Sequence, residues 1–356
     1  MGKIYTAIGL MSGTSMDGVD LSVIRSDGEY EYTHILDKYF EYDEKLHKKL
    51  VNLRGQIFTQ KDLIKLSKEL KILEREITIF HIKIVKEIET KYRDKIDLVG
   101  FHGQTIFHDP NNKTSKQLGD GDLLSQLTKK TVVYDFRQND LNHGGQGAPL
   151  TPIFHNLISN KIYKENMKEC PNLLNIGGIS NITNTIKNEE LSKKNIEAFD
   201  IGPGNCLIDE WIRKNTNKKF DENGSVGKSG KINQIILNQT IENFNSISYN
   251  KSLDIKDFDI SFVRGLSLED GCATITNFTA YLISEGIKYS KNKNEYTSSK
   301  YLVCGGGRKN FHLIESIKKY LSDNHQISID LIDQFNYDGD FIESQAFGYL
   351  AIRSFL

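Results

Sequence analysis

The sequence predicts an α/β protein with two mixed sheets, because one order of elements occurs twice along the chain. In each half, three apolar strand patterns come first, and helices then alternate with further strands. The chain has 356 residues, more than one hydrophobic core usually fills, so two domains are expected. This arrangement implies two sheets that face a shared cleft.

The two halves repeat the order of their elements rather than their residues. In the first half we expect strands at 3–11, 19–25, 30–40, 96–101 and 131–136, a helical region at 43–92, a helix at 120–130 and another after Pro149. In the second half we expect strands at 172–177, 179–186, 196–200, 300–304 and 327–332, helices from 204 through 289, a helix from 309 and a last one from Ile342.

An apolar stripe marks the helical region at 43–92. Its members recur at alternating spacings of three and four: Leu63, Leu66, Leu70, Leu73, Ile77, Phe80 and Ile84. About three heptads of this kind can support a coiled coil, but a helix packed on a sheet requires the same stripe. We favour the packed helix and keep the coiled coil as the alternative.

Charge and cysteine content favour a small-molecule partner in a reducing compartment. Lys plus Arg (46) nearly balances Asp plus Glu (47), for a formal charge of -1, so no nucleic-acid or membrane partner is expected. The cysteines are scattered at Cys170, Cys206, Cys272 and Cys304, with neither zinc spacing nor disulfide density. The first apolar run is too short for a signal peptide or membrane span, so we expect a cytoplasmic protein.

Three glycine clusters at strand ends are candidates for a nucleotide site. The first, GLMSGTSMDGVD at 9–20, offers backbone N–H groups and hydroxyls to an anion, although an ordinary two-strand turn is its alternative. The others are NIGGISN at 175–181 and CGGGRKN at 304–310, and the bare backbone of the last suits a base or ribose. Each is weak alone. Together, in a duplicated α/β frame, they predict a nucleotide held between two domains.

A carboxylate in the second half is held at the end of a predicted strand. The segment FDIGPGN at 199–205 places Asp200 before a turn that is rigid at Pro203. Asp200 either acts as a general base or caps the helix that begins near Asn205, and the turn alone does not decide between them.

Polar side chains also follow two strands of the first half. His102 and Gln104 follow the strand at 96–101, and Asp135 and Arg137 follow the apolar run of the next strand at 131–134. Their donors and acceptors could recognise hydroxyls, an amide or a carboxylate on a sugar. A structural histidine or a surface arginine is the ordinary alternative for each one taken singly.

Assembled, these motifs closely resemble the anhydro-N-acetylmuramic acid kinase family of the sugar-kinase, hexokinase and actin-like superfamily. The resemblance runs nearly end to end and rests on MSGTSMDGVD, FHGQTIFHDP, QLGD at 117–120, DFR, GGQGAPLTPIFH, NIGGISN, FDIGPGN, CGGGRKN and the Glu343 helix. Two departures stand out. Members usually have Lys-Ser-Thr-Gly where this chain has Lys251-Ser252-Leu253-Asp254, and many continue past the position of Leu356 into a Pro/Gly-rich tail.

The resemblance implies a fold and a domain division. It implies two duplicated ribonuclease-H-like mixed-sheet domains of the actin-like ATPase fold, with ATP and sugar in the interdomain cleft. The expected domains span 1–148 and 149–342, with the terminal helix at 343–356 packing back on the first domain. A homodimer is expected, through an exposed surface that the sequence does not locate.

The resemblance also implies an activity. This is ATP-dependent hydrolytic ring opening and 6-phosphorylation of 1,6-anhydro-N-acetylmuramic acid to N-acetylmuramic acid 6-phosphate, by a phosphotransferase with an alcohol acceptor, in cell-wall sugar recycling. Asp200 would take a proton from water as it attacks the anomeric carbon, and the departing O6 would attack the γ-phosphate, with Mg²⁺ stabilising the charge. The alternatives are a kinase of an ordinary free amino sugar and a non-catalytic sugar-sensing or filament-forming member of the superfamily.

By the same resemblance, specific residues acquire roles. Asp200 is the catalytic candidate. The ATP-binding candidates are Met11, Ser12, Gly13, Thr14, Ser15, Met16, Asp17, Gly18, Gly177, Gly178, Gly305, Gly306 and Gly307. The sugar-binding candidates are His102, Gln104, Asp135, Arg137 and Glu343. ATP and Mg²⁺ are the expected cofactors, and the sequence does not identify the Mg²⁺ ligands.

Overall fold

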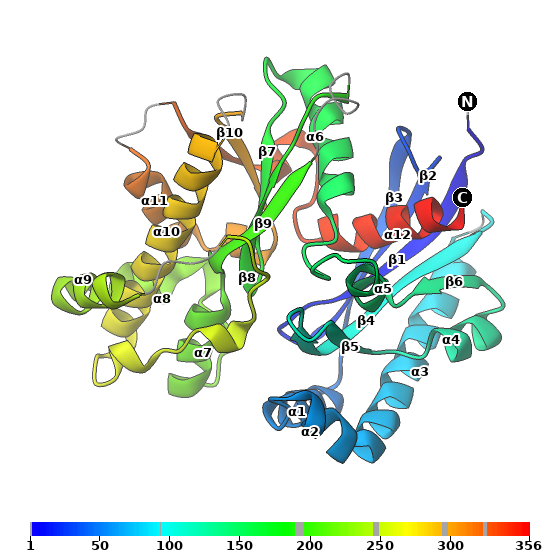
Figure 1. Ribbon diagram of the computed structural model, residues 1–356, viewed down its shortest axis with the longest axis horizontal. Coiled ribbons are helices and arrows are strands. Elements are labelled where there is room, and N and C mark those ends of the chain that lie inside the picture. The colour runs from blue at the N-terminus through cyan, green and yellow to red at the C-terminus, as the bar shows by residue number, and fades with distance from the viewer. Residues whose placement is uncertain (1, 93, 189–195, 245–248, 294–297, 323–325) are drawn as a thin grey trace. The chain divides into compact units, whose positions relative to one another are not determined.

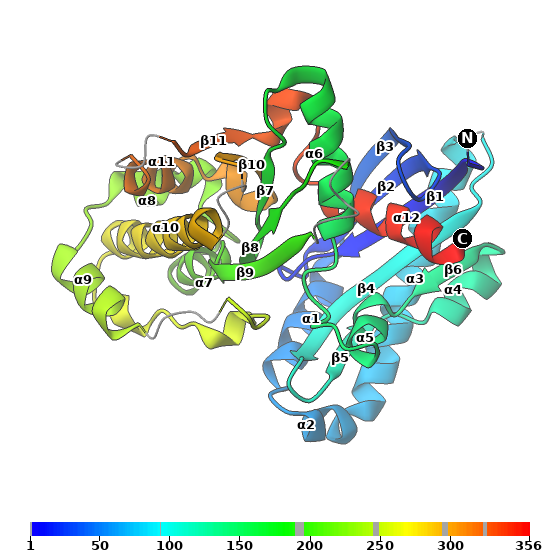
Figure 2. The ribbon, with the colours of Figure 1, turned by 45° about the horizontal axis from the view of Figure 1, so that its top comes forward.

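A computed structural model describes residues 2–92, 94–188, 196–244, 249–293, 298–322 and 326–356. The chain divides into two compact units (Figures 1 and 2). Unit 1 comprises Met1–Phe154 and Phe341–Leu356, and unit 2 comprises His155–Asp340. Each unit has its own sheet and its own hydrophobic core.

The sheet of unit 1 has the order β3-β2-β1-β4, with β5 and β6 both paired to β4. Its strands are β1 (Tyr5–Ser12), β2 (Gly18–Ser26), β3 (Tyr32–Glu41), β4 (Leu98–Asp109), β5 (Thr114–Leu118) and β6 (Thr131–Tyr134). The pairs β1–β2, β2–β3 and β4–β5 are antiparallel. The pairs β1–β4 and β4–β6 are parallel.

The helices of unit 1 are α1 (Glu44–Gly55), α2 (Gln60–Lys65), α3 (Ser67–Lys91), α4 (Gly121–Thr128), α5 (Phe136–Asn142) and α12 (Ile342–Phe355). The first three lie in the region at 43–92 where the sequence predicts helix. The stripe crosses a break at Leu66, so the prediction that it lies on one helix was wrong at its N-terminal end. Leu70, Leu73 and Ile77 are buried in the core, and α3 packs on β4 and β5, so the packed-helix prediction is confirmed.

The sheet of unit 2 has the order β11-β10-β7-β8-β9. Its strands are β7 (Asn172–Ile176), β8 (Ile179–Asn184), β9 (Glu197–Pro203), β10 (Lys300–Cys304) and β11 (Ser328–Leu331). Its α-helices are α6 (Pro152–Asn166), which begins at the end of unit 1, α7 (Cys206–Asn215), α8 (Ser225–Ser229), α9 (Gln234–Asn243), α10 (Leu268–Lys293) and α11 (Phe311–Tyr320). Its 3-10 turns are η2 (Glu222–Gly224), η3 (Ile255–Asp257), η4 (Ser261–Val263), η5 (Gly306–Lys309) and η6 (Ile332–Phe335).

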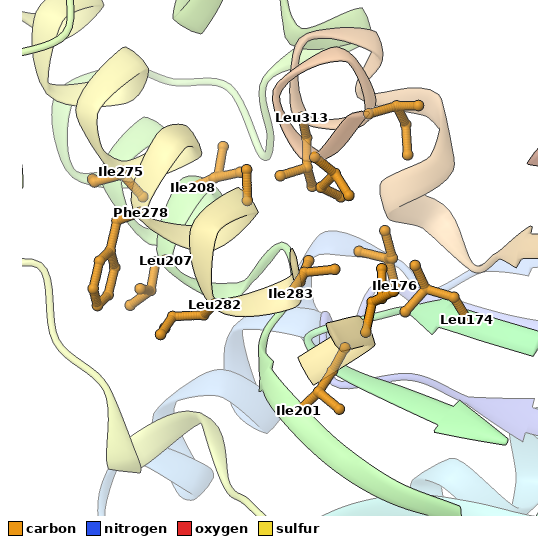
Figure 3. Packing of buried hydrophobic residues seen from close by; sticks show 14 of the residues in the cluster. Leu174, Ile176, Ile201, Leu207, Ile208, Ile275, Phe278, Leu282, Ile283 and Leu313 are labelled. Atoms are coloured by element: carbon orange, nitrogen blue, oxygen red, sulfur yellow. The ribbon is translucent and has the colours of Figure 1, made fainter. Parts of the chain in front are cut away.

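The core of unit 2 lies between the sheet and α10. Figure 3 shows Leu174, Ile176 and Ile201 of the strands among side chains from α7, α10 and α11. Figures 1 and 2 show α10 on one side of β7, β8 and β9 and α6 on the other. The side chains of β7 and β9 alternate, so one set faces this core and the other set faces away from it.

The same topology occurs in both units. In each, three strands form an antiparallel meander, and the first strand then pairs in parallel with a fourth, which pairs in parallel with a fifth. The remaining pairs of unit 2 follow the same rule. The predicted α/β class with duplicated, ribonuclease-H-like mixed sheets is therefore confirmed for each unit.

Three features of unit 1 were not predicted: the second part of β4, strand β5 and helix α5. Strand β4 continues to Asp109, beyond the expected end at 101, and pairs with β5. Polar residues and Gly103, at a φ of 73°, interrupt the apolar pattern after Phe101, although Ile106 and Phe107 are buried in the core and the hydrogen-bonded ladder continues. The short helix α5 has a polar sequence and begins after Asp135 at a φ of 63°, which ends β6.

Helix α12 lies directly on the backbone of the central strands of unit 1. A Cβ atom on Gly9 would lie 1.8 Å from the backbone oxygen of Ser344, and one on Gly100 would lie 2.1 Å from that of Phe347. A real side chain cannot occupy such positions, so the helix can approach β1 and β4 this closely only over glycine. Ser344 Oγ also lies 2.6 Å from Ser22 Oγ of β2, within hydrogen-bonding distance.

We expect Gly9→Ala to lower the free energy of unfolding by about 3 kcal/mol, because backbone atoms of α12 must move to admit the methyl group. Urea denaturation followed by circular dichroism would measure the loss. Gly55→Ala in α1 is the matched control, since a Cβ there meets nothing within 4 Å. An unchanged urea midpoint for Gly9→Ala would contradict the close packing of α12.

Candidate active site

Asp200 lies inside β9 and is buried, with 5% of its surface exposed. Its Oδ2 atom accepts a hydrogen bond from the backbone N–H of Leu253 at 2.8 Å and from the Ser252 hydroxyl at 3.3 Å. Helix α7 begins at Cys206 and its N-cap is Asn205, so the alternative in which Asp200 caps this helix is wrong. The structure therefore contains a buried carboxylate that donors from a distant segment hold in a fixed orientation.

Two of the three glycine clusters meet at the end of β7 in unit 2. The carbonyl oxygens of Gly177 and Gly178 accept hydrogen bonds from Asn205 N at 2.7 Å and Gly204 N at 2.9 Å. Gly307 packs against Ile176, because a Cβ atom there would lie 2.2 Å from the Ile176 side chain. The β7–β8 turn, the start of α7 and the turn after β10 thus form one region of bare backbone.

The turn after β10 is fastened by Arg308. Gly305 has a φ of 80°, and its N–H donates to Gly339 O at 2.8 Å. The Arg308 guanidinium donates to Gly305 O at 3.2 Å and to the carboxylates of Asp333, Asp338 and Asp340. Burial alone would lower the pKa of Arg308, but the hydrogen-bonded Asp333 and Asp340 offset it and raise that pKa. These carboxylates engage the guanidinium, so its role is to hold Gly305 to Gly307 in place.

The first glycine cluster forms the β1–β2 turn of unit 1. Met16 has a φ of 58° and its side chain is buried in the core, as is that of Met11. The Ser12 hydroxyl is also buried and lies 3.0 Å from the Tyr42 hydroxyl. Thr14 and Ser15 are exposed, and the Ser15 hydroxyl donates to Asp17 at 2.5 Å. Of the residues predicted to bind ATP here, Met11 and Met16 could therefore contribute only their backbone.

Gln104 lies beneath this turn rather than at the surface. Its side chain is fully buried, and its Nε2 donates to Gly13 O at 2.9 Å. Its Oε1 has no hydrogen-bond donor among the residues that the structure describes. The side chain thus fixes the position of the glycine turn.

His102 is a buried, neutral histidine that orients Arg137. Burial, followed by the charge of Arg137, lowers the pKa of His102 well below its ordinary value. Nδ1 lies 2.7 Å from Gly103 O, and Arg137 Nε donates to Nε2 at 2.8 Å. The proton therefore resides on Nδ1, and Nε2 is an acceptor.

Arg137 and Glu343 complete this group in unit 1. Arg137 Nη1 donates to Gly147 O at 2.8 Å. Burial raises the pKa of Glu343, in the first turn of α12, and the charge of Arg137 partly opposes that rise. Desolvation also raises the pKa of Asp135, which Lys116 opposes, but Asp135 is exposed and solvent screens the effect. His102, Arg137 and Glu343 are thus brought together. Asp135 precedes α5, and the charge that acts on it is that of Lys116.

The match to known families covers almost the whole chain. A family model described as anhydro-N-acetylmuramic acid kinase matches residues 5–355. The chain belongs to the anhydro-N-acetylmuramic acid kinase family. It is therefore a kinase, and a resemblance that rested on short motifs is confirmed over nearly all of the sequence.

Curated relatives of this family agree with the match. The anhydro-N-acetylmuramic acid kinase of Pelagibacter ubique (strain HTCC1062) is 56% identical over 360 residues, covering 100% of this chain and 93% of that protein. The one from Agrobacterium fabrum (strain C58 / ATCC 33970) is 38% identical over 365 residues, covering 99% and 93%.

Solved structures of other proteins match this chain at much lower sequence identity. The activator of the 2-hydroxyisocaproyl-CoA dehydratase from Clostridium difficile with bound ADPNP has a TM-score of 0.44 and 12% identity, covering 98% of this chain and 95% of its own. A hexokinase from Schistosoma mansoni complexed with glucose has a TM-score of 0.42 and 10% identity, covering 98% and 85%.

Two further properties follow from the described part of the chain. None of the helices described there combines the length and apolar character needed to cross a bilayer. Among the same residues, no group of three or more His, Cys, Asp or Glu side chains could hold a metal ion.

Sequence reasoning missed the partners of Asp200. Lys251-Ser252-Leu253-Asp254 was noted only as a departure from the usual Lys-Ser-Thr-Gly of the anhydro-N-acetylmuramic acid kinase family. The contact from Leu253 to Asp200 comes from the backbone N–H, which any residue except proline can supply. Leucine in place of the usual threonine at position 253 therefore keeps this hydrogen bond. The family motif at 251–254 was the signal in the sequence that could have indicated a contact with Asp200.

We expect Ser252→Ala to lower kcat roughly fivefold with little change in KM for ATP, because one hydrogen bond that orients Asp200 is lost. Turnover would be measured by ADP release with the anhydrosugar. Ser252→Thr keeps the hydroxyl and should restore activity. Ser229→Ala removes an exposed hydroxyl that donates to Val226 O and serves as the control. Equal kcat for Ser252→Ala and wild type would argue against an orienting role.

Proposed function

We propose that this protein uses ATP to convert 1,6-anhydro-N-acetylmuramic acid into N-acetylmuramic acid 6-phosphate, with water opening the anhydro ring, in the recycling of cell-wall sugar. One observation carries the choice of Asp200 as the general base. It is a buried carboxylate whose Oδ2 is held by Leu253 N and Ser252 Oγ, in a chain that matches this kinase family over residues 5–355.

In the proposed reaction, Asp200 takes one proton from a water molecule as the water oxygen forms a bond to the anomeric carbon. The bond from that carbon to O6 breaks, and O6 becomes a nucleophile because it gains the electron pair of the breaking bond. O6 then attacks the γ-phosphorus of ATP, and ADP leaves with the electron pair of the broken phosphoanhydride bond. One carboxylate thus initiates both ring opening and phosphorylation.

The proposed nucleotide contacts come from the three glycine turns. In unit 1, the backbone of Gly13, Thr14 and Ser15 is suited to the phosphates, and Asp17 and Gly18 complete the turn. In unit 2, the proposed contacts are Gly177 and Gly178 with Gly305, Gly306 and Gly307. Support comes from the absence of side chains at these glycines and from the fixed backbone around Gly305 and Gly307.

The proposed sugar contacts come from the group around Arg137. A guanidinium matches the geometry of a carboxylate, such as the lactyl carboxylate of the muramic acid. His102 Nε2 and Gly147 O hold that guanidinium in place. Asp135 and Glu343 would accept from sugar hydroxyls. Gln104 would act through Gly13.

Several further parts of the proposal rest on the family alone. When bound, Mg²⁺ would neutralise the charge that develops on the phosphates, and loss of turnover on chelation would test it. The protein would be a cytoplasmic homodimer, which light scattering and cell fractionation would test. The domain limits at 1–148 and 149–342, with the helix at 343–356, also remain predictions, which limited proteolysis would test.

We expect Asp200→Asn to lower kcat by roughly 10²- to 10⁴-fold and to leave nucleotide affinity nearly unchanged, because the amide cannot accept the water proton. ADP release and the binding of a fluorescent nucleotide would be measured side by side. Asp259→Asn, at an exposed position of unit 2, is the matched control. A normal kcat for Asp200→Asn would remove its role as the base.

We expect the reaction in H₂¹⁸O to place one ¹⁸O atom at C1 of the product, because water attacks the anomeric carbon. Mass spectrometry of product quenched within one turnover would detect it before the anomeric oxygen exchanges. A product that gains no label during transfer would favour the kinase of an ordinary amino sugar. Nucleotide binding without any product would favour the non-catalytic alternative.

A further inference from the structure

A row of polar side chains crosses the sheet of unit 2 at the position of Asp200. The strand register pairs Cys304 with Asn175, Asn175 with Asn181, and Asn181 with Asp200. Side chains of directly paired residues point to the same face of a sheet, with Cβ atoms about 4.5–5.5 Å apart. The amide of Asn181 therefore lies on the same face as the Asp200 carboxylate and next to it.

This row faces away from the hydrophobic core of unit 2. The neighbouring row, shifted by one residue along each strand, consists of the paired residues Leu174, Ile182 and Phe199. Its side chains point to the opposite face and belong to that core. Helix α6 packs on the same face as the polar row, two residues further along β8, where His155 Nδ1 lies 2.8 Å from Thr183 Oγ1. The polar row of Asn175, Asn181 and Asp200 therefore does not pack against α10.

Asn175 and Asn181 differ in what they contact. The Cys304 thiol donates weakly to Asn175 Oδ1 at 3.8 Å, and a Cβ atom on Gly305 would lie 2.3 Å from that oxygen, so Asn175 packs against the third glycine turn. The Oδ1 atom of Asn181 is buried and has no hydrogen-bond donor among the residues that the structure describes. A buried amide oxygen without a donor is costly, which implies that a water or ligand supplies one.

The backbone also singles out this position. The β8–β9 register shifts between Ser180 and Asn181, so that Ser180 pairs with Gly202 and Asn181 with Asp200. Such bulges change the direction of a side chain and are frequent next to active sites. The shift leaves the Asn181 amide beside Asp200, whose own Oδ2 is engaged by Leu253 N and Ser252 Oγ.

We propose that Asn181 is a second residue that contacts the reacting water, and that its Oδ1 accepts a hydrogen bond from the proton that Asp200 does not take. This inference rests on the proposed function. Water has two protons, and with one directed to Asp200 and the other to Asn181, a lone pair of its oxygen points away from both. That lone pair is then aimed at the anomeric carbon.

Methanol separates this role from a merely structural one, because it has a single hydroxyl proton and cannot bond to both residues. In water–methanol mixtures, wild type should form mainly the reducing sugar 6-phosphate rather than the methyl glycoside 6-phosphate. Asn181→Leu, which keeps the volume and removes the acceptor, should lower kcat about 10- to 100-fold. It should also raise the ratio of methyl glycoside to reducing sugar about tenfold, the effect of one lost hydrogen bond.

Matched variants make the test specific. Asn181→Asp keeps an acceptor oxygen and should retain the preference for water, and Asn181→Ala replaces Asn181→Leu if the latter does not fold. Asn184→Leu is the control, since Asn184 is on the same strand but the opposite face, where it accepts from Ser290 at 2.6 Å. It should destabilise the protein without changing the product ratio.

The outcomes are separable. A normal kcat and product ratio for Asn181→Leu would overturn the inference and leave the proposed function intact, provided that wild type incorporates ¹⁸O from water. An increased KM for the sugar with an unchanged product ratio would also overturn it, because Asn181 would then bind the sugar. A wild type that releases no product from the anhydrosugar would instead refute the proposed function.

Discussion

Close approach of backbone to backbone is the physical constraint on which the rest of this structure depends. In unit 1, Gly9 and Gly100 let α12 lie directly on β1 and β4. In unit 2, a Cβ atom on Gly204 would lie 2.1 Å from Gly177 O, so the start of α7 can hydrogen-bond to the β7–β8 turn. The absence of a side chain thus serves packing in one unit and candidate ligand contacts in the other.

In each unit, polar residues act by holding another group. Gln104 holds the carbonyl of Gly13, and Arg308 holds that of Gly305. His102 holds the guanidinium of Arg137, and Ser252 holds the carboxylate of Asp200. A group that must bind a charged ligand needs its orientation fixed before the ligand arrives, because reorientation during the reaction raises the barrier. Residues predicted to contact substrates therefore divide into those that could touch them and those that orient the others.

Much of the fold was predictable because hydrophobic periodicity reports on local structure. The strands around Ile8, Val23 and Leu174 are strongly apolar, and their buried positions agree with the pattern. The second part of β4 was missed because polar residues and Gly103, at a positive φ, interrupt the apolar pattern before Ile106 and Phe107. Helix α5 was missed because it is short and largely polar and follows Asp135 at a positive φ. The break at Leu66 was missed because the spacing of three and four continues across it.

The sequence by itself determined the duplicated order of elements, the family and the glycine turns, because each depends on patterns formed by residues close together in the chain. Only the tertiary structure decided that Asp200 is not a helix cap, that Ser252 and Leu253 hold it, and that Met16 is a core residue. It also decided that Asn181 lies beside Asp200, through a register shift between strands β8 and β9. Such pairings join residues far apart in the chain, and strand register and long-range hydrogen bonds leave no periodic trace in the sequence.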